Sequence, residues 1–375
     1  MTPLQTLIEN RIAESGPLTV AEYMELALYH PSLGYYATRA RRSGRAGDFY
    51  TSVDVGPLFG ACLAQHLAVR YLQSVDHPVP KPPDRFDLVD AGAGDGRLAR
   101  DILDTAAREF PDFYDAIQLH LVERSPAARD AQRQTLGPHA AKLLSTGSTL
   151  PPEIHGALIA NELLDALPCH MVMMTEDGLR EVYVAAGLTA IPGPLSTRAI
   201  EAQLARVGSM LEPGWRAEVN LNASQWIENA AGALRAGELL LFDYGYTAQE
   251  LYSAAHSSGT LARYVGHRMD DRWLEDPGEA DLTAHVDFTA VRLSAEAMGL
   301  HVTRFVDQTR FLVDSGLADR LAIGSELGAV RQRLQARTLI APEGLGGTIK
   351  LLAFEPPSMP LRTGASTVLR AGSVA

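Results

Sequence analysis

The spacing of hydrophobic positions changes along the chain and divides it into two parts. As far as residue 73, apolar residues recur every three or four positions, as in "LQTLIENRIAES", "TVAEYMELALYH" and "VGPLFGACLAQHLAVRYLQ". This period is typical of amphipathic helices, and Thr19 is well placed to cap the second of them. We therefore expect residues 1–80 to form a helical cap that ends in the proline-rich connector "HPVPKPPDR".

Beyond the connector, short apolar runs alternate with helical patterns. The runs "FDLVDAG", "IQLHLVER", "GALIANE" and "GELLLFDYG" predict buried strands, and "GRLARDILDTAARE", "SPAARDAQRQTL" and "SQWIENAAGALRAG" predict helices between them. This alternation is the pattern of a parallel α/β sheet. At the end of the chain, "LHVTRFVDQ" and "GTIKLLAFE" predict an antiparallel hairpin that closes the sheet. We expect a Rossmann-like sheet of seven strands, built from residues 81–170 and 223–356.

Two segments depart from the alternation. The run "CHMVMMTEDGLREVYVAAG" predicts a β-hairpin that turns at Asp177 and Gly178, and it opens an inserted α+β subdomain over residues 171–222. The run "GTLARYVGHRMDDRWLEDPGEADLTAHVDF" fits neither period and predicts an irregular stretch. Long loops inside a compact domain usually carry function. Residues 357–375 are expected to form a flexible tail.

Composition narrows the classes of function. The 45 acidic and 33 basic residues give a net charge of -12, which argues against a general nucleic-acid binder. Cys62 and Cys169 are far apart, and we expect no metal site. The first residues include acidic side chains, and no apolar run is long enough to cross a bilayer. These features predict a cytoplasmic protein that does not insert into membranes.

The strongest local signal is "LVDAGAGDGR", a glycine-rich turn directly after a predicted strand. Gly92, Gly94 and Gly96 lack the sixth-position glycine of the dinucleotide fingerprint, because Arg97 stands there, and no G-K-[ST] follows. Glu123 ends the next strand, where a carboxylate can accept hydrogen bonds from ribose hydroxyls. NAD enzymes share that carboxylate, but the closing hairpin favours the class I methyltransferase fold over NAD folds.

Several separated segments together resemble one family. "LTVAEYMELALYHPSLGYY", "GDFYTS", "VDAGAGDGRLARDIL", "ANELLDALPCH", "LFDYGY", "GTLARYVGHR" and "DLTAHVDF" are similar to the MidA-like family of S-adenosylmethionine-dependent methyltransferases. Its eukaryotic members are mitochondrial protein-arginine methyltransferases that help to assemble respiratory complex I. The resemblance implies S-adenosyl-L-methionine as the cofactor, with Asp90, Gly92, Gly94 and Gly96 at its methionine end and Glu123 on the ribose.

The same resemblance implies that the "GDFYTS" element lies over the bound cofactor. Its family positions fall on Gly47, Asp48, Phe49, Thr51 and Ser52. The chain departs from the family pattern directly afterwards, where Val53 and Gly56 replace a proline and a serine. That departure concerns the local rigidity of the element more than its role.

The run "IANELLDALP" carries the candidate chemistry, because it follows the fourth strand at the edge where open α/β folds bind ligands. Asn161, Glu162 and Asp165 would face the methyl group, with Asn161 also near the cofactor. Paired carboxylates suit a planar, always charged guanidinium. We hypothesise that Glu162 holds the guanidinium with help from Asp165. The two residues are three positions apart and would lie on the same face of a helical turn. Alternatively, both simply suit a helix N-terminus.

Two further clusters leave alternatives open. His285 in "DLTAHVDF" is either a general base or a structural residue. Asp243 and Tyr244 in "DYGY" are expected to line an acceptor pocket, with simple packing as the alternative for Tyr244. The basic run from Arg39 to Arg45 is either a dock for an acidic partner or a solvated loop tip.

The resemblance implies methyl transfer to an arginine of a protein, with a subunit of respiratory complex I as one candidate, and the paired carboxylates make this chemistry sensible. The alternatives are a small-molecule O- or N-methyltransferase, a cofactor-binding assembly or scaffold protein and, last, a nicotinamide oxidoreductase. A homodimer is one option for the quaternary structure.

Overall fold

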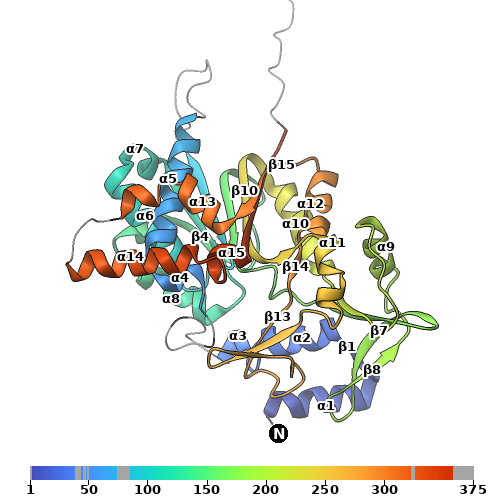
Figure 1. Ribbon diagram of the computed structural model, residues 1–375. Coiled ribbons are helices and arrows are strands. Elements are labelled where there is room, and N and C mark those ends of the chain that lie inside the picture. Colours follow the sequence, from blue (N-terminus) through green and yellow to red (C-terminus); the bar gives the residue numbers. More distant parts are fainter. Residues whose placement is uncertain are drawn as a thin grey trace, which may run out of the picture.

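A computed structural model describes residues 2–38, 44, 48, 50–73, 85–321 and 326–357 (Figure 1). Gly47, Phe49, most of the basic run 39–45, most of the connector and nearly all of the expected tail lie outside the described residues. Within them, no helix is long and apolar enough to cross a membrane.

The centre of the fold is a mixed sheet with the predicted hairpin at its edge. Its strands run in the order β15-β16-β10-β5-β2-β3-β4, and β14 (Val286–Asp287) extends the end of β10 as an eighth strand. The bounds are β2 (Phe86–Ala91), β3 (Ile117–Val122), β4 (Leu143–Gly147), β5 (Ile154–Asn161), β10 (Leu234–Tyr246), β15 (His301–Asp307) and β16 (Ile349–Glu355). β16 is antiparallel to β10 and β15, whereas β10, β5, β2, β3 and β4 are parallel.

Helices cover both faces of this sheet, because alternate strand residues point to opposite sides. Leu240 and Phe242 pack on one side with α5 (Leu58–Gln73) and α6 (Arg97–Glu109). Leu239 and Leu241 pack on the other with α10 (Leu221–Ala233) and α12 (Phe288–Ala297). Helix α5 was expected in the cap, and it lies instead on the large sheet. The other helices of this part are α4 (Ser52–Val55), α7 (Pro111–Ala116), α8 (Pro126–Leu136) and α11 (Ala248–Leu251).

Three helices between β15 and β16 have no counterpart in the predicted elements. They are α13 (Gln308–Asp314), α14 (Leu327–Ile340) and α15 (Leu345–Thr348). Phe311 and Leu339 bury their side chains in the same core as α5. This group of helices therefore completes one face of the large sheet.

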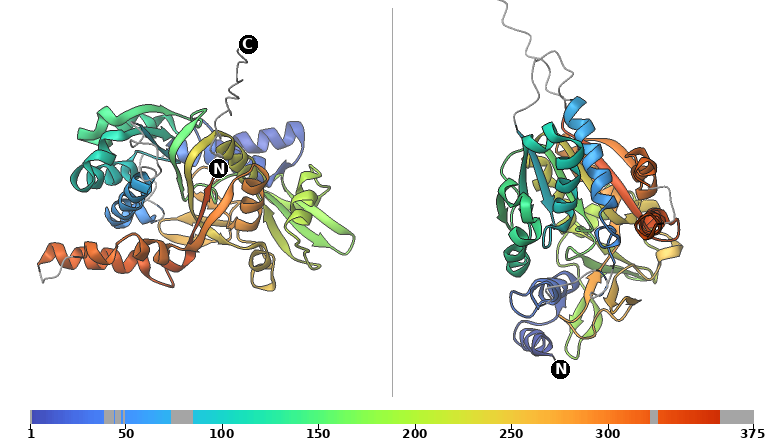
Figure 2. Two further views of the ribbon diagram at one scale, coloured as in Figure 1. Left: turned by 90° about the horizontal axis from the view of Figure 1, so that it is seen from above. Right: turned by 90° about the vertical axis from the view of Figure 1, so that its left-hand side faces the viewer.

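A second layer lies beyond the carboxyl ends of the parallel strands. It contains α1 (Pro3–Ser15), α2 (Val20–Tyr29) and α3 (Tyr35–Thr38), and both figures place the two long helices away from the large sheet (Figures 1 and 2). Thr19 caps α2 in a reciprocal capping box with Glu22, as expected for a cap residue. These helices pack on a five-stranded sheet of β1 (Leu18–Thr19), β6 (His170–Thr175), β7 (Gly178–Ala185), β8 (Thr189–Gly193) and β9 (Arg216–Val219). Helix α9 (Ala199–Arg206), which lies between β8 and β9 in the chain, also packs on this sheet.

Two predictions in this layer are wrong in detail. Thr175 pairs with Gly178, so the two turn residues of the β6–β7 hairpin are Glu176 and Asp177 rather than Asp177 and Gly178. The stretch expected to be irregular contains a three-stranded sheet of β11 (Ala262–Val265), β12 (Arg268–Asp270) and β13 (Asp281–Thr283). Strands of three or four residues are too short to show a period of two.

Candidate active site

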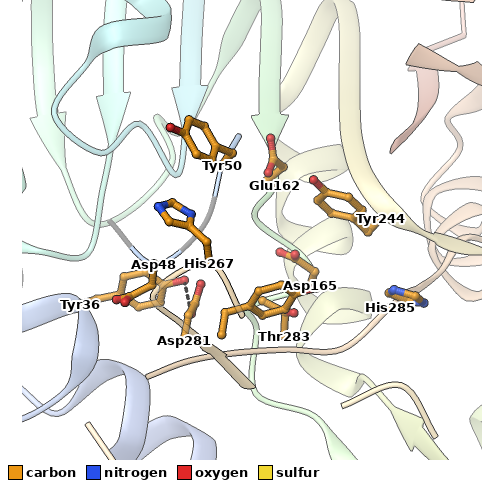
Figure 3. A pocket seen from close by; sticks show the side chains of 11 residues that line it. Tyr36, Asp48, Tyr50, Glu162, Asp165, Tyr244, His267, Asp281, Thr283 and His285 are labelled. Atoms are coloured by element: carbon orange, nitrogen blue, oxygen red, sulfur yellow. Dashed lines mark hydrogen bonds between the residues drawn. The ribbon is translucent and has the colours of Figure 1, made fainter. Parts of the chain in front are cut away.

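A cavity of about 260 Å³ opens between the carboxyl end of β5 and the second layer. Figure 3 shows its side chains converging from both sides. They are Tyr36, Asp48, Tyr50, Glu162, Asp165, Tyr244, Tyr264, His267, Asp281, Thr283 and His285. Four of these are carboxylates, and none of the described lining residues is a lysine or arginine. The cavity is therefore acidic, with aromatic walls.

Glu162 sits at the end of β5 in an uncommon backbone conformation. Its φ of 52° is in the left-handed region, and its N–H donates to the carbonyl of Phe242 at 2.7 Å. Non-glycine residues held there are strained, and such strain is often found at functional sites. Burial raises the pKa of Glu162 to about 8, with Asp243 and Asp54 adding to the rise and the N–H of Ser52 opposing it. At neutral pH this carboxyl is therefore mainly protonated.

Asn161 precedes Glu162 and donates a hydrogen bond to its carboxyl group. Its Nδ2 donates to Oε1 of Glu162 at 3.1 Å, whereas its Oδ1 is buried without a partner. An unpaired buried acceptor is costly unless a ligand satisfies it. Asn161 is thus equipped to contact a ligand as well as to hold the carboxyl.

Asp165 reaches the cavity from a loop, and the expected helical turn is absent. Residues 162–165 form bends and a turn, so neither a shared helical face nor a helix dipole explains the two carboxylates. Burial raises the pKa of Asp165 well above its usual range, and Asp243 and Glu162 raise it further.

Asp243 does not line this cavity, contrary to one of the expected alternatives. It is 1% exposed, and its Oδ2 accepts N–H bonds from Leu163 at 3.2 Å and Leu164 at 2.8 Å. Burial raises the pKa of Asp243 to about 7, against the effect of these N–H groups. Asp243 therefore shapes the loop between Glu162 and Asp165, while Tyr244 presents its ring to the cavity.

The opposite wall is fastened by Asp48. Its Oδ1 accepts the N–H of Gly266 at 2.8 Å, its carbonyl accepts the N–H of His267 at 2.8 Å, and its Oδ2 accepts the hydroxyl of Tyr35 at 2.9 Å. Gly266 and His267 are the turn of the β11–β12 hairpin, and both have positive φ. The ring of His267 stacks on Tyr50 at 4.9 Å. Asp48 therefore ties its own segment to this hairpin.

The sequence pattern did not predict most of the aromatic side chains that line the cavity, such as Tyr36, Tyr50 and Tyr264. The "GTLARYVGHR" and "DLTAHVDF" segments contain Tyr264, His267 and Thr283, but nothing in their spacing distinguishes them from loop residues. Tyr36 donates its hydroxyl to Asp281 at 2.9 Å, a contact between residues 245 positions apart. Only the fold brings such pairs together.

His285 lies at one end of the cavity, apart from Glu162 and Asp165 (Figure 3). Burial and the neighbouring His256 lower its pKa to about 4, so the imidazole is neutral. Its Nδ1 is buried without a partner, and its backbone N–H donates to the hydroxyl oxygen of Thr260 at 3.0 Å.

The glycine-rich turn lies at the end of β2. Gly92, Gly94 and Gly96 all have positive φ, and a Cβ placed on Gly94 would meet nothing within 4 Å. Glu123 accepts the N–H of Gly94 at 2.9 Å, which joins the ends of β2 and β3. The turn therefore leaves open space directly beside its backbone.

Asp90 adds an unsatisfied acceptor to this turn. Its Oδ2 is buried without a partner, and burial raises its pKa to about 7, with Glu123 and Asp95 contributing. A ligand with hydroxyl or ammonium donors would satisfy the acceptors here. S-adenosyl-L-methionine carries both, so the residues present fit this cofactor.

Thr51 and Ser52 begin the short helix α4 between the turn and the cavity. Thr51 forms a capping box with Asp54, whose Oδ1 accepts a hydrogen bond from Arg97 at 2.7 Å. Arg97 therefore ties α4 to the glycine turn, which gives a role to the residue in place of the sixth-position glycine. Ser52 donates its N–H to Glu162 at 3.1 Å.

Comparisons with known proteins agree on one family. Residues 62–306 match the family model described as "Putative S-adenosyl-L-methionine-dependent methyltransferase". The chain is 29% identical to the mouse protein arginine methyltransferase NDUFAF7, mitochondrial, over 95% of its length and 85% of that protein. It is 30% identical to the homologue from Drosophila melanogaster, over 92% of this chain and 83% of that protein.

A solved structure supports the same assignment. A COG1565 superfamily member from Burkholderia thailandensis, bound to S-adenosyl-homocysteine, superimposes with a TM-score of 0.81 at 27% identity. The match covers 94% of this chain and 91% of that one. The expected class I methyltransferase fold is thereby confirmed.

One expectation is overturned by the relatives. A cytoplasmic location was predicted from the first residues and the absence of long apolar runs, but the curated relatives from mouse, fly and human are all named as mitochondrial. Together, the family match, the curated relatives and the solved structure show that the chain belongs to the MidA-like family of S-adenosylmethionine-dependent methyltransferases.

Proposed function

We propose that this protein transfers a methyl group from S-adenosyl-L-methionine to a guanidino nitrogen of an arginine in a protein substrate. The observation that carries the proposal is the acidic, aromatic cavity at the carboxyl end of β5. The printed names of the curated relatives, which are protein arginine methyltransferases, support the same acceptor.

The cavity suits a guanidinium in charge and shape. A guanidinium is planar and always charged, it pairs with carboxylates through two parallel hydrogen bonds, and it stacks on aromatic rings. Glu162 and Asp165 supply carboxyl groups, and Tyr36, Tyr50 and Tyr244 supply rings. A bound cation favours the ionised form of both carboxyls, which offsets the effect of burial on their pKa values.

In this proposal, bound S-adenosyl-L-methionine supplies the electrophilic methyl group. Asp90 and the turn of Gly92, Gly94 and Gly96 hold its methionine end, and Glu123 accepts from the ribose. Asn161 lies between the proposed cofactor site and the acceptor cavity. Thr51 and Ser52 belong to the segment that lies between the glycine turn and this cavity.

Glu162 and Asp165 orient the guanidinium and keep one nitrogen free to attack. As the new N–C bond forms and the S–C bond breaks, Glu162 takes up the proton that the nitrogen loses. We assign His285 to the wall of the cavity, because its lowered pKa makes it a weak base and it lies apart from Glu162 and Asp165. The second layer, with the cap helices and the inserted strands, would present the protein substrate.

The test is methyl transfer from labelled cofactor to arginine-containing peptides, with methylarginine identified by mass spectrometry. We expect transfer by the wild type and a loss of at least about 100-fold in Glu162→Gln, since that variant keeps the shape and removes the charge. Methylation of free amines or hydroxyl compounds without any peptide would indicate the small-molecule alternative. Cofactor binding without any transfer would indicate the scaffold alternative.

A further inference from the structure

A buried chain of hydrogen bonds reaches Glu162 from the C-terminal helices. Gln308, the first residue of α13, is 0% exposed, and its Nε2 donates to the carbonyl of Leu339 at 3.0 Å. Its Oε1 accepts the hydroxyl of Ser52, also fully buried, at 2.7 Å. An amide nitrogen only donates and its oxygen only accepts, so these two bonds fix the orientation of the amide.

The contact to Gln308 also fixes what Ser52 presents to Glu162. The hydroxyl of Ser52 is committed to Gln308, and its backbone N–H donates to Oε1 of Glu162 at 3.1 Å. Asn161 donates to the same oxygen at 3.1 Å. No described residue donates a hydrogen bond to Oε2, so this oxygen remains for a ligand.

We propose that Gln308 is a positioning residue for the methyl acceptor: by holding Ser52, it fixes Glu162 with Oε1 anchored and Oε2 available to the acceptor. The inference rests on the proposed function, because it takes Glu162 as the group that holds the guanidinium. Gln308 itself touches neither the cavity nor the glycine turn.

The charges around Glu162 explain why this anchor matters. Asp243 and Asp165 face it from β10 and from its own loop, Asp54 faces it from α4, where Arg97 pairs with that carboxylate, and the neutral hydroxyl of Tyr244 lies beside it. Asp243 and Asp54 favour the protonated form of Glu162, whereas the N–H of Ser52 and the amide of Asn161 favour the ionised form. If the anchor is lost, Glu162 stays protonated to a higher pH, and the acid limb of the activity profile moves up.

The experiment compares Gln308→Leu, Ser52→Ala and the double variant with the wild type. The control is Gln203→Leu, because Gln203 is also a buried glutamine whose Oε1 accepts a serine hydroxyl, that of Ser224 at 3.1 Å. Gln203 lies in α9, which contributes nothing to the cavity. The measurement is kcat/KM for an arginine peptide from pH 6 to 9.

We expect Gln308→Leu and Ser52→Ala to lower kcat/KM about tenfold at pH 7 and to move the acid limb up by about one pH unit, the size expected for one hydrogen bond to a charged group. The double variant should be no worse than the worse single variant, since both break the same chain. The control should keep the wild-type profile, and both the control and Gln308→Leu should keep their affinity for S-adenosylhomocysteine.

An acid limb that stays in place would overturn the inference, even with a lower kcat/KM. If Gln308→Leu does not fold, Ser52→Ala decides, since it removes only a hydroxyl.

If the wild type methylates no peptide, the proposed function fails separately. The role of Gln308 is then tested by a carbon-13 titration of the Glu162 carboxyl, identified as the signal missing in Glu162→Gln. An unchanged pKa in Gln308→Leu and Ser52→Ala would contradict it.

Discussion

The guanidinium of Arg124 lies 4.0 Å above the ring of Tyr29. Arg124 directly follows Glu123 at the cofactor edge, and Tyr29 donates its hydroxyl to the carbonyl of Ala166, next to Asp165, at 3.1 Å. A single side chain in α2 therefore contacts both the segment after β3 and the loop that carries Glu162 and Asp165.

Replacing Tyr29 should separate these two contacts. Tyr29→Phe keeps the stacked ring and loses the bond to Ala166, so we expect a rise of about threefold to tenfold in KM for an arginine peptide and little change in affinity for S-adenosylhomocysteine. Tyr29→Leu loses both contacts and should weaken S-adenosylhomocysteine binding as well, by about threefold. Calorimetry and steady-state kinetics measure the two effects.

The control for Tyr29 is Tyr114, whose ring also carries a cation, Lys142 at 4.4 Å, far along the sheet from the cavity. Tyr114→Leu should change stability and leave both constants unaltered. Equal losses in both leucine variants would mean that Tyr29 acts through general stability.

The buried carboxyl of Asp90 predicts an unusual pH dependence of stability. The folded protein keeps this group protonated up to about pH 7, whereas the unfolded chain releases the proton near 3.8. The free energy of unfolding therefore falls as the pH rises between these values, by at most about 4 kcal/mol. We expect Asp90→Asn to be more stable than the wild type at pH 8 and similar at pH 4, although it binds the cofactor less tightly.

Asp87 on the same strand provides the opposite case. Its carboxylate accepts bonds from Arg85 at 2.8 Å and from the N–H of His155 at 2.9 Å. Asp87→Asn should destabilise the protein at pH 8, because it weakens these bonds. Denaturant unfolding at the two pH values measures both variants, and a less stable Asp90→Asn at pH 8 would contradict the account.

Acceptor binding should release protons. Because burial raises the pKa of Glu162 to about 8, a guanidinium that enters at pH 7 favours loss of about one proton from this carboxyl. Affinity for an arginine peptide should consequently rise with pH up to about 8. Calorimetric titration in phosphate and in Tris buffer counts the protons, and Glu162→Gln should release fewer.

Gly94→Ala tests whether the open turn is a cofactor site. The residue has a φ of 53° and free space beside it, so the backbone cost should be about 1–2 kcal/mol without any clash inside the protein. We expect a further loss of at least tenfold in affinity for S-adenosylhomocysteine, because the new methyl group occupies the space left for the ligand.

Gly137 shares with Gly94 the φ of 53° and the free space beside it, and it lies at the end of α8. Gly137→Ala should lose stability and no affinity. If the two variants bind S-adenosylhomocysteine equally well, Gly94 is not beside the ligand.

The hydrophobic pattern predicted the large sheet because its strands are buried on both faces and its helices have one apolar side. It could not predict α14, which packs only a few residues on the core, or the short strands of the second layer. Glu162 was identified because it follows a strand at the ligand-binding edge. Its partner Ser52 lies 110 positions earlier, and no local pattern links the two.

Strand β10 runs on beyond the large sheet and serves several parts of the site in turn. Phe242 pairs with Asn161 and accepts the N–H of Glu162, Asp243 holds the loop, Tyr244 faces the cavity, and Gly245 pairs with Val286. Successive residues of one strand thus hold the backbone of Glu162, shape the loop that follows it, line the cavity and pair with β14. A single inserted residue before Phe242 would displace all four together, so evolution can vary the acceptor through the second layer far more easily than through this strand.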